Sequence, residues 1–152
     1  MIKIDNSEKY SGVTFHSIDY LMDISKIQYV NILSLYEWKW IYVQNKDRKT
    51  WELPWWHCEL WETILESARR ELFEETWSID YAISQIWYWT LQMASWEEVY
   101  GAVFLAKIKE IWVLPESEIG RIDFFLEQPE ILTYPEIQIP LCNYFLDWGS
   151  SL

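Results

Sequence analysis

Glycine, cysteine and basic side chains are all scarce in this sequence. It has 4 glycines and 2 cysteines in 152 residues, and 12 lysines and arginines stand against 24 aspartates and glutamates. Two cysteines, Cys58 and Cys142, are too few for a disulfide framework and fit a reducing compartment. The formal net charge of -12 argues against binding to a nucleic-acid duplex, because neutralising phosphates requires clustered lysine and arginine.

Long apolar runs are absent as well. No stretch approaches the ~18 apolar residues that a membrane span requires, and the N-terminal segment carries acids in place of the apolar core of a signal peptide. We therefore expect a cytoplasmic protein that makes no membrane contact. A length of 152 residues and a hydrophobic content of 51% predict that residues 1–152 form a single packed domain.

Hydrophobic periodicity predicts strands on both sides of a central helix and a second helix near the end of the chain. Pro135 favours a helix start, because proline is preferred in the first turn, and Pro140 is expected to kink or shorten that helix. This order of elements indicates an α/β (α+β) fold, in which helices cover a mixed β-sheet. The predicted strands span residues 13–18, 27–36, 40–44, 50–53, 79–91, 98–108 and 120–126, and the predicted helices span residues 62–76 and 135–146.

The central helix carries three acids on one side. Glu71, Glu74 and Glu75 stand at i, i+3 and i+4, so their side chains converge on one part of the helix surface. Like charges at this spacing destabilise a helix by about 0.2–0.5 kcal/mol per pair. Hard oxygen ligands beside room for water suit Mg²⁺ that bridges to substrate phosphates. A solvated acidic face in an acidic protein is the alternative interpretation of the same pattern.

An apolar stripe runs beside these acids. Leu65, Ala68 and Leu72 recur at i, i+3 and i+7, which is the spacing of one helix face. The acids are therefore expected at the rim of the core and not on the outermost solvated face.

This helix resembles the Nudix box, which runs Gly, five residues, Glu, seven residues, Arg-Glu-apolar-x-Glu-Glu-x-Gly-apolar. Here Glu62 is followed after seven residues by Arg70 and Glu71, and then by Glu74 and Glu75. Every charged position of the box is occupied at the right spacing. Five charged residues in a fixed register are a strong signal.

Segments outside the box extend the resemblance. The stretch Trp-Glu-Leu-Pro at 51–54 is similar to the segment that leads into the box, and residues 97–101 and 132–136 are similar to segments of MutT-like members. The resemblance covers most of the chain from residue 27 onward. It implies a Nudix-type α/β/α sandwich with a mixed β-sheet, a catalytic loop-helix-loop and a C-terminal helix.

The resemblance also implies a metal site. In the family pattern Glu71, Glu74 and Glu75 hold Mg²⁺, with Mn²⁺ as an alternative. The backbone carbonyl of Trp55 is implied as a further ligand.

Other residues are assigned supporting or substrate-contacting roles. The resemblance implies that Arg70 pairs with a helix carboxylate and fixes its direction, and that Glu62 supports the junction of loop and helix. Glu97 or Glu98, with Glu98 preferred, is the candidate general base or further metal ligand, and a solvated acid at a strand entry is the alternative. Lys46 and Arg48 are candidate contacts to substrate phosphates, and a polar turn with exposed basic residues is the alternative.

The implied function is Mg²⁺-dependent hydrolysis of a pyrophosphate bond in a nucleoside diphosphate-linked substrate. The expected substrate is a nucleoside triphosphate, including oxidised forms such as 8-oxo-dGTP, with release of a nucleoside monophosphate and pyrophosphate. The partner is then a small-molecule nucleotide, and the chain is a monomer or homodimer. Two alternatives stay open, a non-catalytic Nudix-fold module that binds nucleotide and an acidic, aromatic-rich interaction protein.

The departures from the box share one form. Trp56 and Trp77 stand at the two box glycines, and Trp55 and Trp61 stand at two further positions where the family commonly has glycine. Glycine serves such loops because it accepts positive φ and close backbone approach. Trp residues do neither cheaply, and each strained position costs on the order of 1–3 kcal/mol. The chain has 12 tryptophans against 4 glycines, although glycine is normally among the commonest residues.

We therefore hypothesise that these tryptophans replace glycine in the natural protein. UGA codons that the source organism reads as glycine are one explanation, and deliberate glycine-to-tryptophan substitution is the rival. An aromatic platform that stacks on bases or sugars is the alternative in which tryptophan is native. We take Trp40 and Trp51 as genuine, and Trp38, Trp87, Trp96 and Trp112 as further candidates for glycine.

Overall fold

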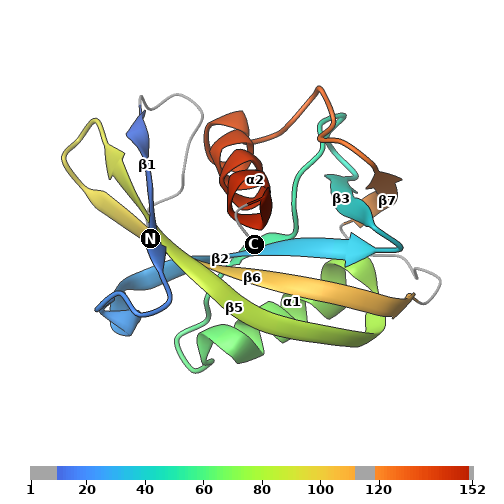
Figure 1. Cartoon of the computed structure of the whole chain (residues 1–152), viewed down its shortest axis with the longest axis horizontal. Helices are drawn as coiled ribbons and strands as arrows, with labels where there is room; N and C mark the ends of the chain where they lie inside the picture. Colours follow the sequence, from blue (N-terminus) through green and yellow to red (C-terminus); the bar gives the residue numbers. More distant parts are fainter. Residues whose placement is uncertain (1–9, 112–118, 151–152) are drawn as a thin grey trace.

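A mixed seven-stranded sheet lies between two helices in the computed structural model, which describes residues 10–111 and 119–150 (Figure 1). The strand order is β1-β5-β6-β2-β3-β7, and β4 pairs with β2 off this path. A short 3-10 helix at Ile24–Lys26 precedes β2. The strands are β1 (Tyr10–Ser17), β2 (Ile27–Tyr36), β3 (Lys39–Asn45), β4 (Trp55–His57), β5 (Ser78–Met93), β6 (Glu98–Ile111) and β7 (Ile119–Phe125), and the long helices are α1 (Ile64–Thr76) and α2 (Pro135–Ser150).

The sheet is mixed because β2 and β6 are parallel while the other pairs of strands are antiparallel. α1 covers one face of the sheet and α2 covers the other (Figure 1). The predicted α+β class with helices over a mixed sheet is therefore confirmed. We refer to the two faces as the α1 face and the α2 face.

Alternation along β2 divides the core between the two faces. Val30 and Ile32 pack with Leu72 of α1, whereas Tyr29 and Leu33 pack on the other side with residues of α2. Successive side chains of a strand point to opposite faces, so a fully buried strand can serve both layers. The continuous apolar sequence of β2 fits this central position.

α1 begins and ends with recognisable caps. Thr63 is the N-cap, and its side chain and that of Glu66 exchange hydrogen bonds with each other's backbone N–H, which forms a capping box. The helix ends at Thr76, and the residue that caps it, Trp77, has a left-handed backbone and donates its N–H to the Phe73 carbonyl. The predicted start at 62 is thus two residues early.

The predicted apolar stripe is correct at two positions and wrong at one. Ala68 and Leu72 are fully buried, but Leu65 is 39% exposed. Ile64, one residue earlier, packs against the α1-face core in its place. The buried stripe therefore begins at Ile64 and not at Leu65, because the capping box sets the direction of the chain in the first turn.

Two further predictions, the strand at 50–53 and the shortened last helix, differ from the structure. The predicted strand at 50–53 is only a pair of isolated bridges, Val43–Glu52 and Trp51–Leu132. Pro140 does not shorten the last helix, which continues to Ser150. Trp112 lies outside the described residues.

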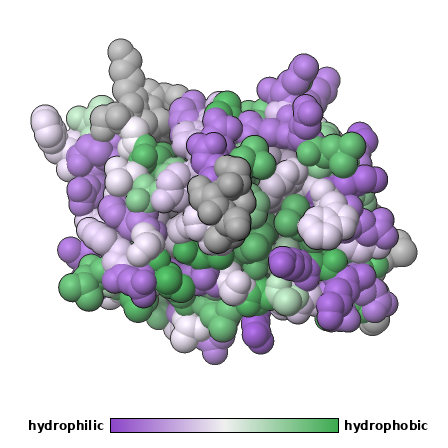
Figure 2. Space-filling model, in the orientation of Figure 1, coloured by the Kyte–Doolittle hydropathy of each residue, from purple (hydrophilic) through white to green (hydrophobic). Residues whose placement is uncertain are grey.

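Hydrophilic and hydrophobic residues both occur on the surface. Figure 2 shows hydrophilic and hydrophobic residues side by side on the face that it presents. Within the described part of the chain, no helix is long and apolar enough to cross a membrane.

Candidate functional site

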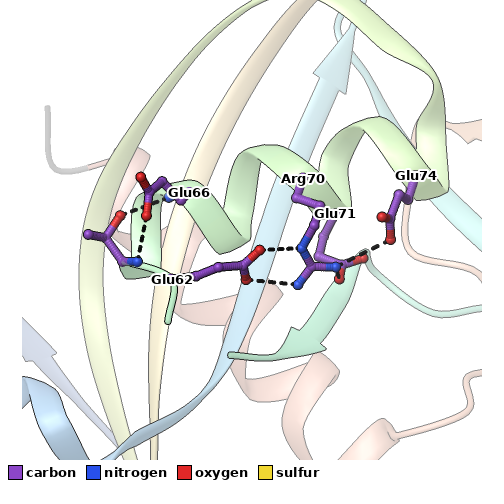
Figure 3. Close-up of polar contacts among 6 residues, drawn as sticks. Glu62, Glu66, Arg70, Glu71 and Glu74 are labelled. Atoms are coloured by element: carbon purple, nitrogen blue, oxygen red, sulfur yellow. Dashed lines mark hydrogen bonds and ion pairs between the residues drawn. The ribbon is translucent and has the colours of Figure 1, made fainter. Parts of the chain in front are cut away.

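Arg70 is the centre of an ion cluster on α1 (Figure 3). Its Nε and Nη2 donate to the two carboxylate oxygens of Glu62, at 2.5 and 2.9 Å. Its Nη1 donates to Glu71 and, at 3.3 Å, to Glu74. The structure therefore brings together four of the five charged positions of the predicted site through one guanidinium, whose planar fork suits two-point binding of a carboxylate.

Two of the acids point into the protein. Glu71 is 2% and Glu75 is 8% exposed, and they stand one turn apart on the same helix face as Leu72. Glu74 differs, because its side chain is 55% exposed. The acids were expected at the rim of the core, and Glu71 and Glu75 lie deeper than that.

Burial changes the acidity of this pair. Removal from water raises the pKa of Glu71 to about 9, against the opposing attraction of Arg70. Burial also raises the pKa of Glu75 well above its ordinary value, and the negative charges of Glu52 and Glu71 add to that rise. The backbone N–H of Trp55 donates to the Glu75 carboxylate and opposes the rise, while Glu75 Oε2 is buried with no hydrogen-bond partner among the described residues. Such an oxygen is costly as an anion unless a cation reaches it.

Glu52 is a third buried acid, one that is absent from the site residues predicted from the sequence. Its pKa is raised by burial, and it pairs with Arg48 at 3.3 Å. Arg48 also donates to the Tyr134 hydroxyl at 3.4 Å. In the sequence Glu52 stands between the apolar residues Trp51 and Leu53. On an alternating strand this pattern predicts an exposed acid, so the sequence does not indicate that Glu52 is buried.

The two basic residues that were predicted to contact substrate phosphate, Arg48 and Lys46, lie in different surroundings. Arg48 lies beside the acids through Glu52, whereas Lys46 is exposed in the turn that follows β3. The structure thus connects one of the two predicted phosphate contacts to the site.

Glu98 is not brought into this cluster. It accepts a hydrogen bond from the Tyr100 hydroxyl and lines an open hollow at the other end of the sheet. β2 places Asn31 beside both Trp55 and Val103, and Glu98 is five residues before Val103 on β6. At about 3.3 Å per residue, Glu98 lies roughly 17 Å along the strand from the Trp55 row.

The tryptophans at family glycine positions occupy different settings. Trp55 stacks on Tyr29 at 5.2 Å between ring centroids and meets Tyr134 edge-on at 4.6 Å. Trp56 is paired in register with Val30 of β2, and Trp61 is exposed in the loop before α1. Trp77 has the left-handed backbone already described. Of the four, Trp55 is the one with aromatic contacts on both sides, to Tyr29 of β2 and to Tyr134 just before α2.

The arrangement supplies oxygen ligands without a ready-made cage. Among residues 10–111 and 119–150, no three acidic, histidine or cysteine side chains are grouped closely enough to hold a metal ion. Arg70 donates hydrogen bonds to the carboxylates of Glu71 and Glu74. The donor chemistry, carboxylates with one unpartnered oxygen, fits a hard divalent cation.

Comparisons with known proteins identify the architecture. No protein-family model and no curated protein matches the sequence. In structure, the chain is similar to a pyrophosphohydrolase of Bacillus subtilis, with a TM-score of 0.72 and 18% identity over 90% of each chain. It is similar to a UDP-X diphosphatase, with a TM-score of 0.62 and 21% identity over 81% of this chain and 64% of that chain. It is also similar to a NUDIX hydrolase of Nitrosomonas europaea, with a TM-score of 0.57 and 18% identity over 80% of this chain and 90% of that one. This chain therefore has the Nudix fold, as its sequence predicted.

Proposed function

We propose that this chain is a Nudix hydrolase that cleaves a pyrophosphate bond in a nucleoside diphosphate-linked substrate with the help of Mg²⁺. The observation that carries the proposal is the buried carboxylate group on α1. Glu71 and Glu75 are withdrawn from water, and an oxygen of Glu75 has no hydrogen-bond partner in the described part of the chain. Acids in this position are stable as anions only when a cation joins them.

The proposed ligands of the cation are Glu71, Glu74, Glu75 and the backbone carbonyl of Trp55. Mg²⁺ takes a small number of carboxylates together with substrate phosphate oxygens, and Mn²⁺ has the same preference for oxygen. When bound, the cation neutralises the pyrophosphate and the charge that develops as water attacks phosphorus.

Arg70 is proposed as the residue that directs the carboxylates. Its two hydrogen bonds to Glu62 anchor the guanidinium to the loop, while its single contacts to Glu71 and Glu74 are the ones that a cation can replace. We expect the Glu62 pair to persist when Glu71 and Glu74 turn to the cation. Arg70 then holds the loop and the helix in register.

We propose Arg48 as the main contact to substrate phosphate and Lys46, which is exposed in the turn after β3, as a second one. Arg48 is held beside the acids by Glu52 and Tyr134, so its charge is available where the pyrophosphate must lie. A guanidinium that already has a carboxylate partner can exchange it for a phosphate oxygen with little reorganisation.

Glu98 is the proposed general base. Its place at the start of β6, bonded to Tyr100, means that this role requires the β5–β6 end of the sheet to approach the acids when substrate binds. If Glu98 is the general base, the Glu98→Gln variant should lower kcat by about 10²-fold and leave KM unchanged. An unchanged kcat removes Glu98 from the mechanism.

Within this reaction class we propose a nucleoside triphosphate, such as 8-oxo-dGTP, as the substrate. The support is the MutT-like resemblance of the sequence, together with the structural similarity to a pyrophosphohydrolase and to a UDP-X diphosphatase. A panel of ordinary and oxidised nucleoside triphosphates, ADP-ribose and nucleotide sugars tests the choice by comparison of kcat/KM.

The decisive assay measures Mg²⁺-dependent release of phosphate or pyrophosphate across this panel. The double variant with Glu71→Gln and Glu75→Gln should lose more than about 100-fold in kcat. Glu66→Gln is the matched control, because Glu66 is an acid on the same helix that caps its first turn and stands outside the cluster. Turnover that survives the double substitution contradicts the proposed site.

A nucleotide-binding module without turnover is the competing function. The observation that favours it is Trp55, whose indole fills the space between Tyr29 and Tyr134 where the family pattern has glycine. Tight nucleotide binding with no turnover, both by this chain and by a chain with glycine at 55, 56, 61 and 77, would establish that module.

A further inference from the structure

Three tryptophans have a backbone conformation that tryptophan rarely adopts. Only four non-glycine residues in the described part of the chain have positive φ, namely Glu37 at 48°, Trp38 at 67°, Trp77 at 56° and Trp96 at 69°. The left-handed region places Cβ too close to the following carbonyl for L-residues, and glycine escapes this clash. Tryptophan has no short polar side chain that could compensate, as asparagine and aspartate do.

Each of the three lies in a turn that is normally built with glycine. Glu37 and Trp38 are the two loop residues between β2 and β3, flanked by the paired residues Tyr36 and Lys39. Positive φ at both central residues defines a type I′ turn, whose preferred second residue is glycine.

The hairpin between β5 and β6 has a different turn with the same requirement. The Trp96 N–H donates to the Met93 carbonyl at 3.0 Å, and the Met93 N–H donates to the Glu97 carbonyl at 2.8 Å. This is a three-residue loop that closes on a left-handed residue, a position normally taken by glycine. Trp77 occupies the left-handed position that ends α1, and glycine is the usual residue there too.

Packing contacts of the three indoles are few. Trp38 is 90% and Trp96 is 87% exposed, so neither buries apolar surface in return for its strained backbone. Trp77 contacts Phe73 at 4.9 Å between ring centroids, but its Nε1 is buried without a hydrogen-bond partner among the described residues. Packing therefore does not explain why tryptophan stands at these three positions.

Other tryptophans form a contrasting group in the core. Trp89 is fully buried and its Nε1 donates to Asn31 Oδ1 at 2.7 Å. Trp40 meets Phe145 edge-on, and Trp51 packs on Phe125. None of these three has positive φ. Trp87, which the sequence analysis placed among the glycine candidates, is buried in β5 and contacts several aromatic rings, so its setting is that of the core group.

We propose that positions 38, 77 and 96 are glycine in the protein as its source cell makes it, and that each is encoded by a UGA codon which that cell reads as glycine. The inference rests on three unrelated turns that share one backbone requirement and one unsuitable residue. It is independent of the proposed catalytic function, because it rests on backbone conformation and is tested by thermal stability and codon identity, not by turnover. The cellular partner that it implies is a glycine-accepting tRNA that reads UGA.

The test compares glycine and alanine at each tryptophan. Trp38→Gly, Trp77→Gly and Trp96→Gly should each raise the melting temperature by about 2–4 °C, because relief of roughly 1 kcal/mol of strain has that effect in a chain of this size. Alanine at the same positions removes the indole and keeps the strain, so each glycine variant should melt higher than its alanine counterpart.

Core tryptophans supply the control. At Trp40 and Trp89 glycine should melt at or below alanine, and both should melt below the parent chain. The proposal is overturned if glycine does not exceed alanine at 38, 77 and 96. It is also overturned if the coding DNA carries UGG at those positions, whereas UGA there, together with UGG at Trp40 and Trp89, supports it.

Discussion

Raising the pH should destabilise the metal-free protein. Glu71 has an ordinary pKa of 4.5, which burial raises to about 9 in the folded chain. A carboxyl with a raised folded pKa binds its proton more tightly when the protein is folded. Its contribution to stability is therefore complete below pH 4.5 and is lost as the pH rises through about 9.

The size of the effect follows from one retained proton. Between pH 6 and pH 8 the folded chain keeps the Glu71 proton that the unfolded chain has released. This lowers the free energy of unfolding by about 1.4 kcal/mol per pH unit, or about 3 kcal/mol over the interval. At about 2–4 °C per kcal/mol, the melting temperature should fall by roughly 6–12 °C. Burial raises the pKa of Glu75 and of Glu52 as well, so these acids act in the same direction.

Circular dichroism melting curves in EDTA at pH 6 and pH 8 measure this difference directly. Added Mg²⁺ should recover most of the loss at pH 8, because the proposed site binds ionised carboxylates. Glu71→Gln removes one titrating group and should weaken the dependence on pH, whereas Glu66→Gln, on the same helix, should preserve it. A metal-free melting temperature that stays level or rises from pH 6 to pH 8 would refute the reasoning.

Three further outcomes are expected. Arg70→Ala should lower the free energy of unfolding, measured by urea titration, by about 1–3 kcal/mol, because it leaves carboxylates without their hydrogen-bond donor. Arg70→Lys should recover only part of this lost stability, since lysine has no planar fork. Trp89→Ala should cost about 3–5 kcal/mol in the same titrations, and Trp89→Phe should cost less while still leaving Asn31 without its donor. Arg48→Gln should raise KM by about tenfold with little change in kcat, the loss of one charge-assisted contact to substrate; an unchanged KM would remove Arg48 from the substrate site.

The fold was readable from the sequence because its strongest signals are local. The central helix follows from its periodic apolar residues, and the long apolar strands follow from their β-branched and aromatic content. The resemblance to the Nudix box then supplied the layer arrangement, which the comparison of structures confirms. The phase of the first helical turn was less accessible, because the capping box at Thr63 turns Ile64 inward and leaves Leu65 exposed.

The candidate site was only partly accessible from sequence. Spacing along one helix is enough to predict that Glu71 and Glu75 share a face, and the structure shows both on the buried face of α1. Contacts between distant segments carry no such periodic signal. The hydrogen bond from Arg48 to Tyr134 joins residues 86 positions apart, and the location of Glu98 depends on the register of β6 against β2.

The buried face of α1 explains why this helix is both a structural element and a candidate site. Ala68 and Leu72 fix it to the sheet, while Glu71 and Glu75 occupy the adjoining positions, where an apolar residue would pack at lower cost. Two buried carboxyl groups whose ionised forms repel each other do not serve stability alone. Arg70 offsets the repulsion for Glu71 and leaves the Glu75 oxygen unpartnered. The remaining deficit of positive charge lies at one point, beside the Trp55 backbone, and a divalent cation at that point would stabilise the fold and supply the chemistry together.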